Sequence, residues 1–448
     1  MENQLKGSMV TGNPTKALIA FTLPMVGGNL FQQFYNIVDS IIVGNVVGED
    51  ALAAVGASTA ITMLFVMVAI GTGIGCSVVV SQLFGANQLA KMKTAISTAL
   101  LSILGFSILL SILGMAINKG ILRLMGTPDN IFPEASAYLQ IYFYGFVFLF
   151  LYNAFSAIFN ALGDSTKPLL FLMFSSILNI GLDLFFVAKL HMGVAGAAWA
   201  TLISQAISAV LSFGFLMSKL KGIETEYFAK YDVGMLKRMV TVAIPTIVQQ
   251  SIVSVGMLLI QSVVNRFGST FIAGYTAAVK IDGIAITPMV AVGNAASTYV
   301  AQNMGARKPE RISQGYRICL TMAAGIGLFI AVVLHFAGEE VVGLFMDSAN
   351  SAGAISIGAE YLSIVSLFYF IMGIMNVSSG ILRGAADMKW FLACSLCNLA
   401  TRVVLSYALA GITAGKIIMW ANPIGWSVGL IIAVFRYFQG GWKKRVLI

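Results

Sequence analysis

The chain has 448 residues, of which 58% are hydrophobic and only 10% charged, and its mean hydropathy is +0.89. Apolar runs of about 20 residues or longer recur along the whole length, which is typical of a polytopic helical membrane protein. The formal net charge of +9 would indicate a nucleic-acid partner for a soluble protein, but membrane topology accounts for it here, so we expect no nucleic-acid partner.

Hydropathy and turn residues predict twelve membrane-spanning helices. Those of the first half are Ala17 to Val43, Ala51 to Phe84, Ala95 to Ile117, Ala137 to Phe159, Pro168 to Ala188 and Val194 to Met217. Those of the second half are Val240 to Val264, Phe271 to Val300, Ile318 to Phe336, Ile357 to Leu382, Trp390 to Gly411 and Ile417 to Phe435. The sequence thus predicts an N-terminal lobe over residues 1–217, a cytoplasmic linker over 218–239 and a C-terminal lobe over 240–448.

The basic residues sort to one side of the predicted membrane. Loops on the side of the N-terminus carry 20 of the 27 lysine and arginine residues. Cytoplasmic loops carry such an excess. We therefore expect a multi-pass protein of the cytoplasmic membrane, embedded in the lipid bilayer, with both termini in the cytoplasm.

The two halves of the sequence resemble each other. The segment that begins at Gln82 recurs at Gln302, a spacing of 302 − 82 = 220 residues, and Pro24 recurs as Pro245. Because each half has six spans, both halves start on the same side of the membrane, so a pseudo-two-fold axis near the membrane normal relates them. Two such lobes leave a central cleft, which is common in transporters that work by alternating access.

The first predicted span carries a proline and a carboxylate. Pro24 removes a helical hydrogen bond and creates a place where the helix can bend, so it is a candidate conformational hinge, with a static kink as the alternative. Asp39 lies farther along the same span. A carboxylate within a membrane span is costly and usually faces a cavity or a partner. Asp39 is therefore a functional candidate, the alternative being a helix cap.

Four sequence features together resemble one known family. They are Leu23-Pro24 with Asp39 in the first span, Gln82-x-x-Gly85-Ala86, the turn Leu162-Gly163-Asp164-Ser165, and Leu178-Asn179-Ile180-Gly181-Leu182-Asp183. Their order, spacing and duplication resemble the multidrug and toxic compound extrusion (MATE) transporters from about Pro14 to Arg436. The resemblance implies a V-shaped pair of six-helix lobes and efflux of amphipathic, often cationic, organic compounds in exchange for H⁺ or Na⁺.

A cation-coupling site is expected in the first lobe. Asn179 and Asp183 lie one helical turn apart on the same face of the fifth span, and Thr201 adds a hydroxyl from the sixth. If these spans meet the first, Asp39 and Asp183 share a pocket in which one carboxylate must bind a proton or share Na⁺. The resemblance supports all four positions, although interhelical hydrogen bonding would also explain Asn179 and Thr201.

Further polar residues are candidates for the substrate cavity. The resemblance implies that Gln32, two helical turns before Asp39, faces the substrate. Tyr138 and Asn153 in the fourth span are expected to line the same cavity. Apart from Na⁺ at the two carboxylates, no metal site is expected.

The second lobe carries Lys280, Asp282 and Arg402 within predicted spans. The interpretation we favour from sequence is a buried charge pair between Asp282 and Arg402 or Lys280 that fixes helix packing. In the alternative interpretation, a positively charged side chain takes the place of a bound cation here. Such a charge would disfavour cationic substrates and favour anionic or zwitterionic ones.

The sequence as a whole predicts a monomeric antiporter that exports organic compounds and uses no cofactor. A lipid or lipid-linked-sugar flippase is the alternative, but it would need more lysine and arginine within its membrane spans to bind phosphate groups. An intramembrane enzyme would need a histidine-based or metal-based constellation at helical spacing, and none is present in the sequence. We therefore expect no enzymatic activity.

Overall fold

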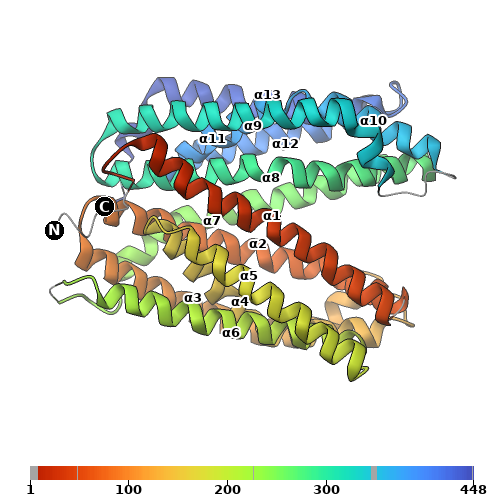
Figure 1. Ribbon diagram of the computed structural model, residues 1–448, viewed down its shortest axis with the longest axis horizontal. Helices are drawn as coiled ribbons and strands as arrows, with labels where there is room; N and C mark the ends of the chain where they lie inside the picture. The colour runs from red at the N-terminus through yellow and green to blue at the C-terminus, as the bar shows by residue number, and fades with distance from the viewer. Residues whose placement is uncertain (1–8, 48, 226, 345–350, 446) are drawn as a thin grey trace. The chain divides into compact units, whose positions relative to one another are not determined.

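The computed structural model describes residues 9–47, 49–225, 227–344, 351–445 and 447–448, without the side chains of residues 39–47, 49–52 and 60. This part of the chain is helical and contains no strand (Figure 1). The α-helices are α1 Pro14–Val47, α2 Glu49–Gly85, α3 Leu89–Leu124, α4 Phe132–Ala161, α5 Thr166–Asp183, α6 Gly193–Lys221, α7 Val233–Val264, α8 Ser269–Gly305, α9 Pro309–Gly343, α10 Ala352–Ser366, α11 Tyr369–Gly384, α12 Met388–Leu409 and α13 Lys416–Gln439. The short elements are η1 Leu184–Lys189, η2 Asn265–Phe267 and η3 Gly441–Lys444.

The helices have the length and composition of membrane spans. Ten of those searched within the described residues are long and apolar enough to cross a membrane, and the pair α10–α11, bent by 52°, makes an eleventh. The first predicted span falls within α1, which runs for 34 residues. Since a helix satisfies its own backbone hydrogen bonds in lipid, this architecture is the one that the apolar sequence favours. The prediction of an all-α membrane protein with two lobes is confirmed.

Two pairs of turns show that the halves share their geometry as well as their sequence. Asn87 after α2 and Arg307 after α8 have left-handed backbones, with φ of 56° and 55°. Gly163 after α4 and Ala386 after α11 are likewise left-handed, with φ of 79° and 59°. In all four turns the next residue donates its N–H to the carbonyl five residues back, which satisfies a free carbonyl at the helix end. The internal repeat predicted from sequence is therefore present in the backbone.

An ion pair is also repeated. Asp164, in the turn after α4, accepts a hydrogen bond from Lys219 Nζ at 3.0 Å, and Asp387, in the turn after α11, accepts one from Arg436 Nε at 2.6 Å. The first pair is half-buried, whereas Asp387 is only 1% exposed. Both pairs join a helix-ending turn to the last turn of the final helix of the same half.

The packing divides the chain into two compact units that do not coincide exactly with the two halves of the sequence. The first unit contains residues 27–247; the second contains the described residues up to Val26 together with 248–448. Both boundaries lie inside helices, α1 and α7, and each follows a proline by two residues, Pro24 and Pro245. The first part of α1 therefore belongs to the unit formed by the second half, and the first part of α7 to the unit formed by the first half.

The segments that precede α1 and α7 are likewise hydrogen-bonded within the unit formed by the other half of the sequence. Met9 donates its N–H to Gln302 Oε1 at 3.0 Å and accepts from Arg311 at 3.2 Å, both within the second unit. Asp232 donates its N–H to Thr98 Oγ1 at 3.0 Å within the first unit. Polar side chains of α8, α9 and α3 thus hold the lead-in segments of α1 and α7.

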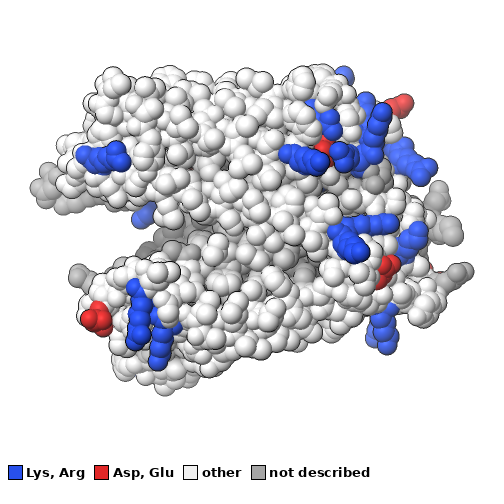
Figure 2. Space-filling model, turned by 180° about the vertical axis from the view of Figure 1, so that it is seen from behind, with Lys and Arg blue, Asp and Glu red and all other residues white. Residues whose placement is uncertain are grey.

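Charged side chains collect near helix ends. On the face that Figure 2 shows, lysine and arginine lie toward both ends of the view, and the middle of the surface is almost free of charge. A band of uncharged surface along the helices is what a lipid-facing region requires. The chain is thus a multi-pass membrane protein.

Candidate functional site

Three of the four residues predicted to bind the coupling ion lie together in the first unit. Asn179 and Asp183, on α5, are both 0% exposed. Helical spacing places them one turn apart on the same face, where α5 packs against α6 and its Thr201. The helices thus bring a carboxylate, an amide and a hydroxyl to one buried location.

The Asn179 amide connects this cluster. Its partners assign the amide orientation in which its nitrogen donates to Asp183 Oδ2 at 2.9 Å and to the Tyr35 hydroxyl at 2.8 Å. In that orientation its oxygen accepts from the backbone N–H of Thr201 at 3.1 Å. One amide therefore joins α1, α5 and α6. We call Tyr35, Asn179, Asp183 and Thr201 the amide-centred cluster.

Asp39, the second predicted carboxylate, belongs to α1, but its side chain lies outside the described residues. Tyr35 stands one helical turn before it on the same helix. The position of the Asp39 carboxylate relative to Asp183 therefore stays a prediction.

The backbone changes its helical form next to the cluster. α5 ends at Asp183, and the chain continues as the π-helical segment Leu184–Lys189. Segments of π-helix are often found at functional sites. Asp183 thus lies at the junction between the two forms.

The donor set of the cluster suits a proton or a small hard cation. A carboxylate within a membrane span is costly unless hydrogen bonds or a cation stabilise it, and the Asn179 amide supplies one such bond. The other oxygen atoms of the cluster are the Tyr35 phenol, the Thr201 hydroxyl and the Asn179 amide oxygen, which accepts from the backbone N–H of Thr201. The described residues include no group of three or more histidine, cysteine, aspartate or glutamate side chains that would hold a transition metal.

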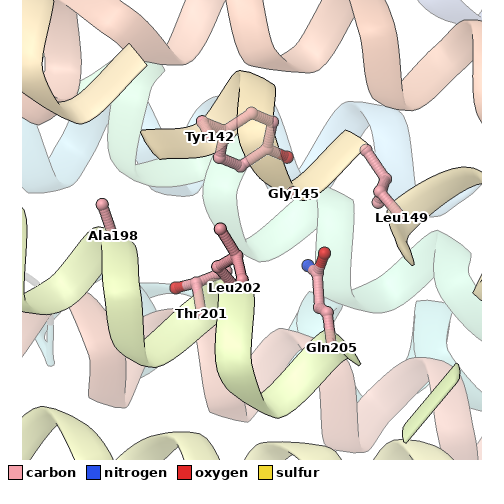
Figure 3. Close-up of a pocket in the computed structure, with 7 residues that line it drawn as sticks. All are labelled: Tyr142, Gly145, Leu149, Ala198, Thr201, Leu202 and Gln205. Carbon is pink, nitrogen blue, oxygen red and sulfur yellow. The ribbon is translucent and has the colours of Figure 1, made fainter. Parts of the chain in front are cut away.

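A small pocket adjoins the cluster between α4 and α6. Its cavity volume is only about 10 Å³, which is roughly the space of one water molecule. Figure 3 shows its lining residues, which are Tyr142, Gly145, Leu149, Ala198, Thr201, Leu202 and Gln205. Thr201 belongs to both the pocket and the amide-centred cluster, and Gln205 follows it by one helical turn. Polar groups therefore continue along α6 from the cluster into the pocket.

The predicted cavity residues have different surroundings. Gln32 is exposed on α1. Tyr138 stacks on Tyr142 of the pocket, with ring centroids 6.2 Å apart. Asn153 donates to the Leu149 carbonyl of its own helix at 2.8 Å, a bond within α4. Their contact with a substrate stays a prediction.

Lys280, Asp282 and Arg402 of the second lobe make no salt bridge with one another in the described part of the chain. Asp282 is buried and accepts a hydrogen bond from the Tyr369 hydroxyl at 2.7 Å, whereas Lys280 is exposed. In the part of the chain that the structure describes, no cation lies within salt-bridge distance of this carboxylate, Arg402 included. Phenols and not a guanidinium contact the carboxylate directly, and the role of a charge pair between Asp282 and Arg402 in helix packing stays a prediction.

Sequence reasoning missed several polar partners. Tyr35 carried a usable signal, since it precedes Asp39 by one helical turn. Tyr361 and Tyr369 lie on α10 and α11, on either side of the 52° bend, so spacing along one straight span would not have placed them together. Asn422, on α13, donates to the Tyr361 hydroxyl at 2.7 Å.

Comparisons with known proteins agree with this architecture. The family model MatE matches residues 24–185 and 245–408, one match in each half. The chain is 31% identical over 443 residues to "Probable multidrug resistance protein YpnP" of Bacillus subtilis (strain 168), with 97% of each chain covered. It is 26% identical over 443 residues to "Probable multidrug resistance protein YoeA" of the same organism, with 96% of this chain and 94% of that protein covered.

A solved structure shows the same fold. It is described as "Outward-facing conformation of a multidrug resistance MATE family transporter of the MOP superfamily", and it superposes with a TM-score of 0.91 at 23% identity, covering 98% of this chain and 99% of the other. The fold, the duplicated family match and the full-length relatives agree with one another. The chain belongs to the MatE family, the multidrug and toxic compound extrusion (MATE) efflux transporters.

Proposed function

We propose that this transporter is a secondary active antiporter of the cytoplasmic membrane, with both termini in the cytoplasm, that exports amphipathic organic compounds in exchange for H⁺ or Na⁺. The observation that carries the proposal is the buried amide-centred cluster, in which Asn179 joins Asp183 to Tyr35 and Thr201. The names of its relatives, which are probable multidrug resistance proteins, support an organic substrate. In this proposal the transporter acts as a monomer and needs no cofactor.

Coupling requires that the ion and the substrate stabilise different conformations. An effector shifts a conformational equilibrium only by its difference in affinity for the two states, typically about 1–3 kcal/mol. The cluster joins α1 to α5 and α6, and α1 contains Pro24. In the proposed mechanism, ion binding at Asp39 and Asp183 changes the hydrogen bonds of Tyr35, and α1 bends near Pro24 in response. The altered cavity then releases the substrate outside.

The test is ethidium efflux from proteoliposomes that hold the purified protein, under an imposed pH gradient and, separately, an imposed Na⁺ gradient. We expect one gradient to drive efflux and Asp39→Asn to abolish it, because the variant loses a titratable group that also binds cations. Asp129→Asn, in the turn between α3 and α4, is a control carboxylate that should keep activity. Full activity of a well-expressed Asp39→Asn variant would refute the assigned role of Asp39.

The flippase alternative predicts a different result. It requires gradient-independent movement of a phospholipid or an undecaprenyl-linked sugar in the same liposomes. No feature of the described residues favours it over antiport.

A further inference from the structure

The segment that follows α13 is folded back onto the second unit. Gly440 ends the helix with a left-handed backbone, φ 74°, and its N–H donates to the Tyr437 carbonyl at 3.2 Å. Trp442 of η3 is 0% exposed, stacks on the Tyr437 ring with centroids 5.5 Å apart, and donates its indole N–H to the Tyr437 carbonyl at 2.9 Å. Tyr437 in turn packs on Tyr316 of α9, with ring centroids 4.3 Å apart. A buried, hydrogen-bonded tryptophan therefore holds this segment in one place.

Three consecutive basic residues follow the buried tryptophan. We call Lys443, Lys444 and Arg445 the basic run; all three are exposed. In the part of the chain that the structure describes, no carboxylate lies within salt-bridge distance of them. The Arg445 N–H donates to the Trp442 carbonyl at 3.0 Å, so the backbone of the run is held by the same short helix. The basic run therefore presents three charges at a fixed place, and no described carboxylate neutralises them.

The neighbouring cation Arg436, in contrast, is used within the fold. It is buried, donates to Asp387 at 2.6 Å and lies over the Trp390 ring, 5.2 Å from the ring centroid. A Cβ atom on Gly441 would lie 2.3 Å from Arg436 Nη1, so a residue without a side chain is favoured where the segment crosses the guanidinium. The Asp387 carboxylate thus neutralises Arg436, whereas the charges of the basic run point away from the protein interior.

Exposed aromatic side chains lie directly before the basic run. Phe438, in the last turn of α13, is 79% exposed, and Phe435, about one turn earlier, is exposed as well. Rings that are so open at the protein surface are favourable in lipid and unfavourable in water. Phe438 precedes Lys443 by 443 − 438 = 5 residues, and the chain turns back between them. The basic run therefore lies close to the depth at which the acyl chains end and the lipid headgroups begin.

We propose that Lys443, Lys444 and Arg445 form a binding surface for the headgroups of anionic phospholipids at the membrane surface where α13 ends. Each lysine or arginine near an anionic membrane surface adds to the attraction. A phosphatidylglycerol headgroup carries a net negative charge, whereas a phosphatidylcholine headgroup also carries a cation, so the basic run discriminates between the two lipids. This inference goes beyond the proposed function, because lipid binding requires neither a coupling ion nor a transported compound.

Lipid binding by the purified protein tests the inference. Native mass spectrometry of the protein released from detergent gives its Kd for phosphatidylglycerol and, separately, for phosphatidylcholine with the same acyl chains. The triple variant of the basic run carries Lys443→Gln, Lys444→Gln and Arg445→Gln. We expect it to bind phosphatidylglycerol more weakly by roughly tenfold or more and phosphatidylcholine as before, because three attractive charges are lost for the anionic lipid.

A matched control variant removes the same amount of positive charge from another part of the chain. It changes three exposed cations of α3 and η1, which are Lys119→Gln, Arg123→Gln and Lys189→Gln. Because both triple variants lower the net charge equally, an effect of net charge alone would weaken binding equally. We expect a much smaller loss of phosphatidylglycerol binding in the control. Equal losses in the two variants, or no loss in the variant of the basic run, would overturn the inference.

Two further measurements test which chemistry the basic run recognises. A variant with Lys443→Arg, Lys444→Arg and Arg445→Lys keeps every charge and should keep the Kd for phosphatidylglycerol; a loss as large as that of the glutamine variant would contradict recognition by charge. Inorganic phosphate carries the anion without acyl chains, so at the concentration of the lipid it should not displace phosphatidylglycerol. Displacement of the lipid by free phosphate would overturn the assignment of a lipid partner.

Discussion

At the scale of single residues, the Asn179 side chain links several groups of the candidate site although it carries no charge. It is 0% exposed, and its amide contacts three helices through Asp183, Tyr35 and Thr201. An amide both donates and accepts, so it can hold a carboxylate and a backbone N–H at once. The negative charge of Asp183 is thus linked to the hydroxyl of α1 through one side chain.

Replacing Asn179 by alanine should change the ion dependence of transport. The variant loses a charge-assisted hydrogen bond to the Asp183 carboxylate, which is worth about 1.5–3 kcal/mol, equivalent to roughly tenfold or more in affinity. We therefore expect the ion concentration at half-maximal ethidium efflux to shift by about that factor. With H⁺ as the coupling ion the shift is to lower proton concentration, because a carboxylate that loses this bond binds a proton more tightly. Asn153→Ala is the matched control, because the Asn153 amide bonds only within α4. If both variants shift the ion dependence equally, Asn179 has no special role.

Sequence spacing predicted part of this cluster. Helical periodicity was enough to place Asn179 and Asp183 on one face of α5, and the structure adds Thr201 from α6. It was not enough for Asp282 of α8, because its hydrogen-bond donor Tyr369 lies on a different helix, α11. Packing between helices distant in sequence has no signal in the periodicity of either helix.

At the scale of elements, the broken span α10–α11 was also not predictable from periodicity. The sequence predicts one span from Ile357 to Leu382, yet the chain bends by 52° between Ser366 and Tyr369, where it contains neither proline nor glycine. The hydrogen bond from Tyr369 to Asp282 accompanies the break. No proline or glycine at the break accounts for the end of this helix, and the tertiary hydrogen bond of Tyr369 is one contact that stabilises the bent form.

The repeated ion pair gives a comparison within one molecule. Removing Asp387 leaves the Arg436 guanidinium buried without its carboxylate, a loss that costs about 3–5 kcal/mol. Removing Asp164 leaves a half-buried Lys219 that reaches water, which costs about 0–1 kcal/mol. Chemical unfolding in detergent should accordingly show a much larger loss of stability for Asp387→Ala than for Asp164→Ala. Similar losses would mean that burial does not set the strength of these pairs.

At the scale of the whole molecule, the two halves exchange their first segments. The described residues up to Val26 belong to the second unit, and the rest of α1 belongs to the first. α7 is divided in the same way near Pro245. Each of these helices is therefore a continuous covalent link between the units. We expect the contacts that hold the first part of each helix to restrict the motion of this link.

Replacing Arg311 tests whether these contacts restrict the motion of α1. Its Nη atoms donate to the carbonyls of Gly12 at 3.1 Å and Met9 at 3.2 Å, so Arg311→Ala should release the segment that leads into α1. We expect faster amide hydrogen exchange at residues 9–13 and a lower maximal rate of ethidium efflux with an unchanged half-saturating concentration, because the change affects the link and not the binding groups. Arg317→Ala, farther along α9, is the control for loss of a positive charge. Faster exchange without any change in efflux would show that the segment is bound there but does not limit transport, and unchanged exchange would show that Arg311 does not hold it.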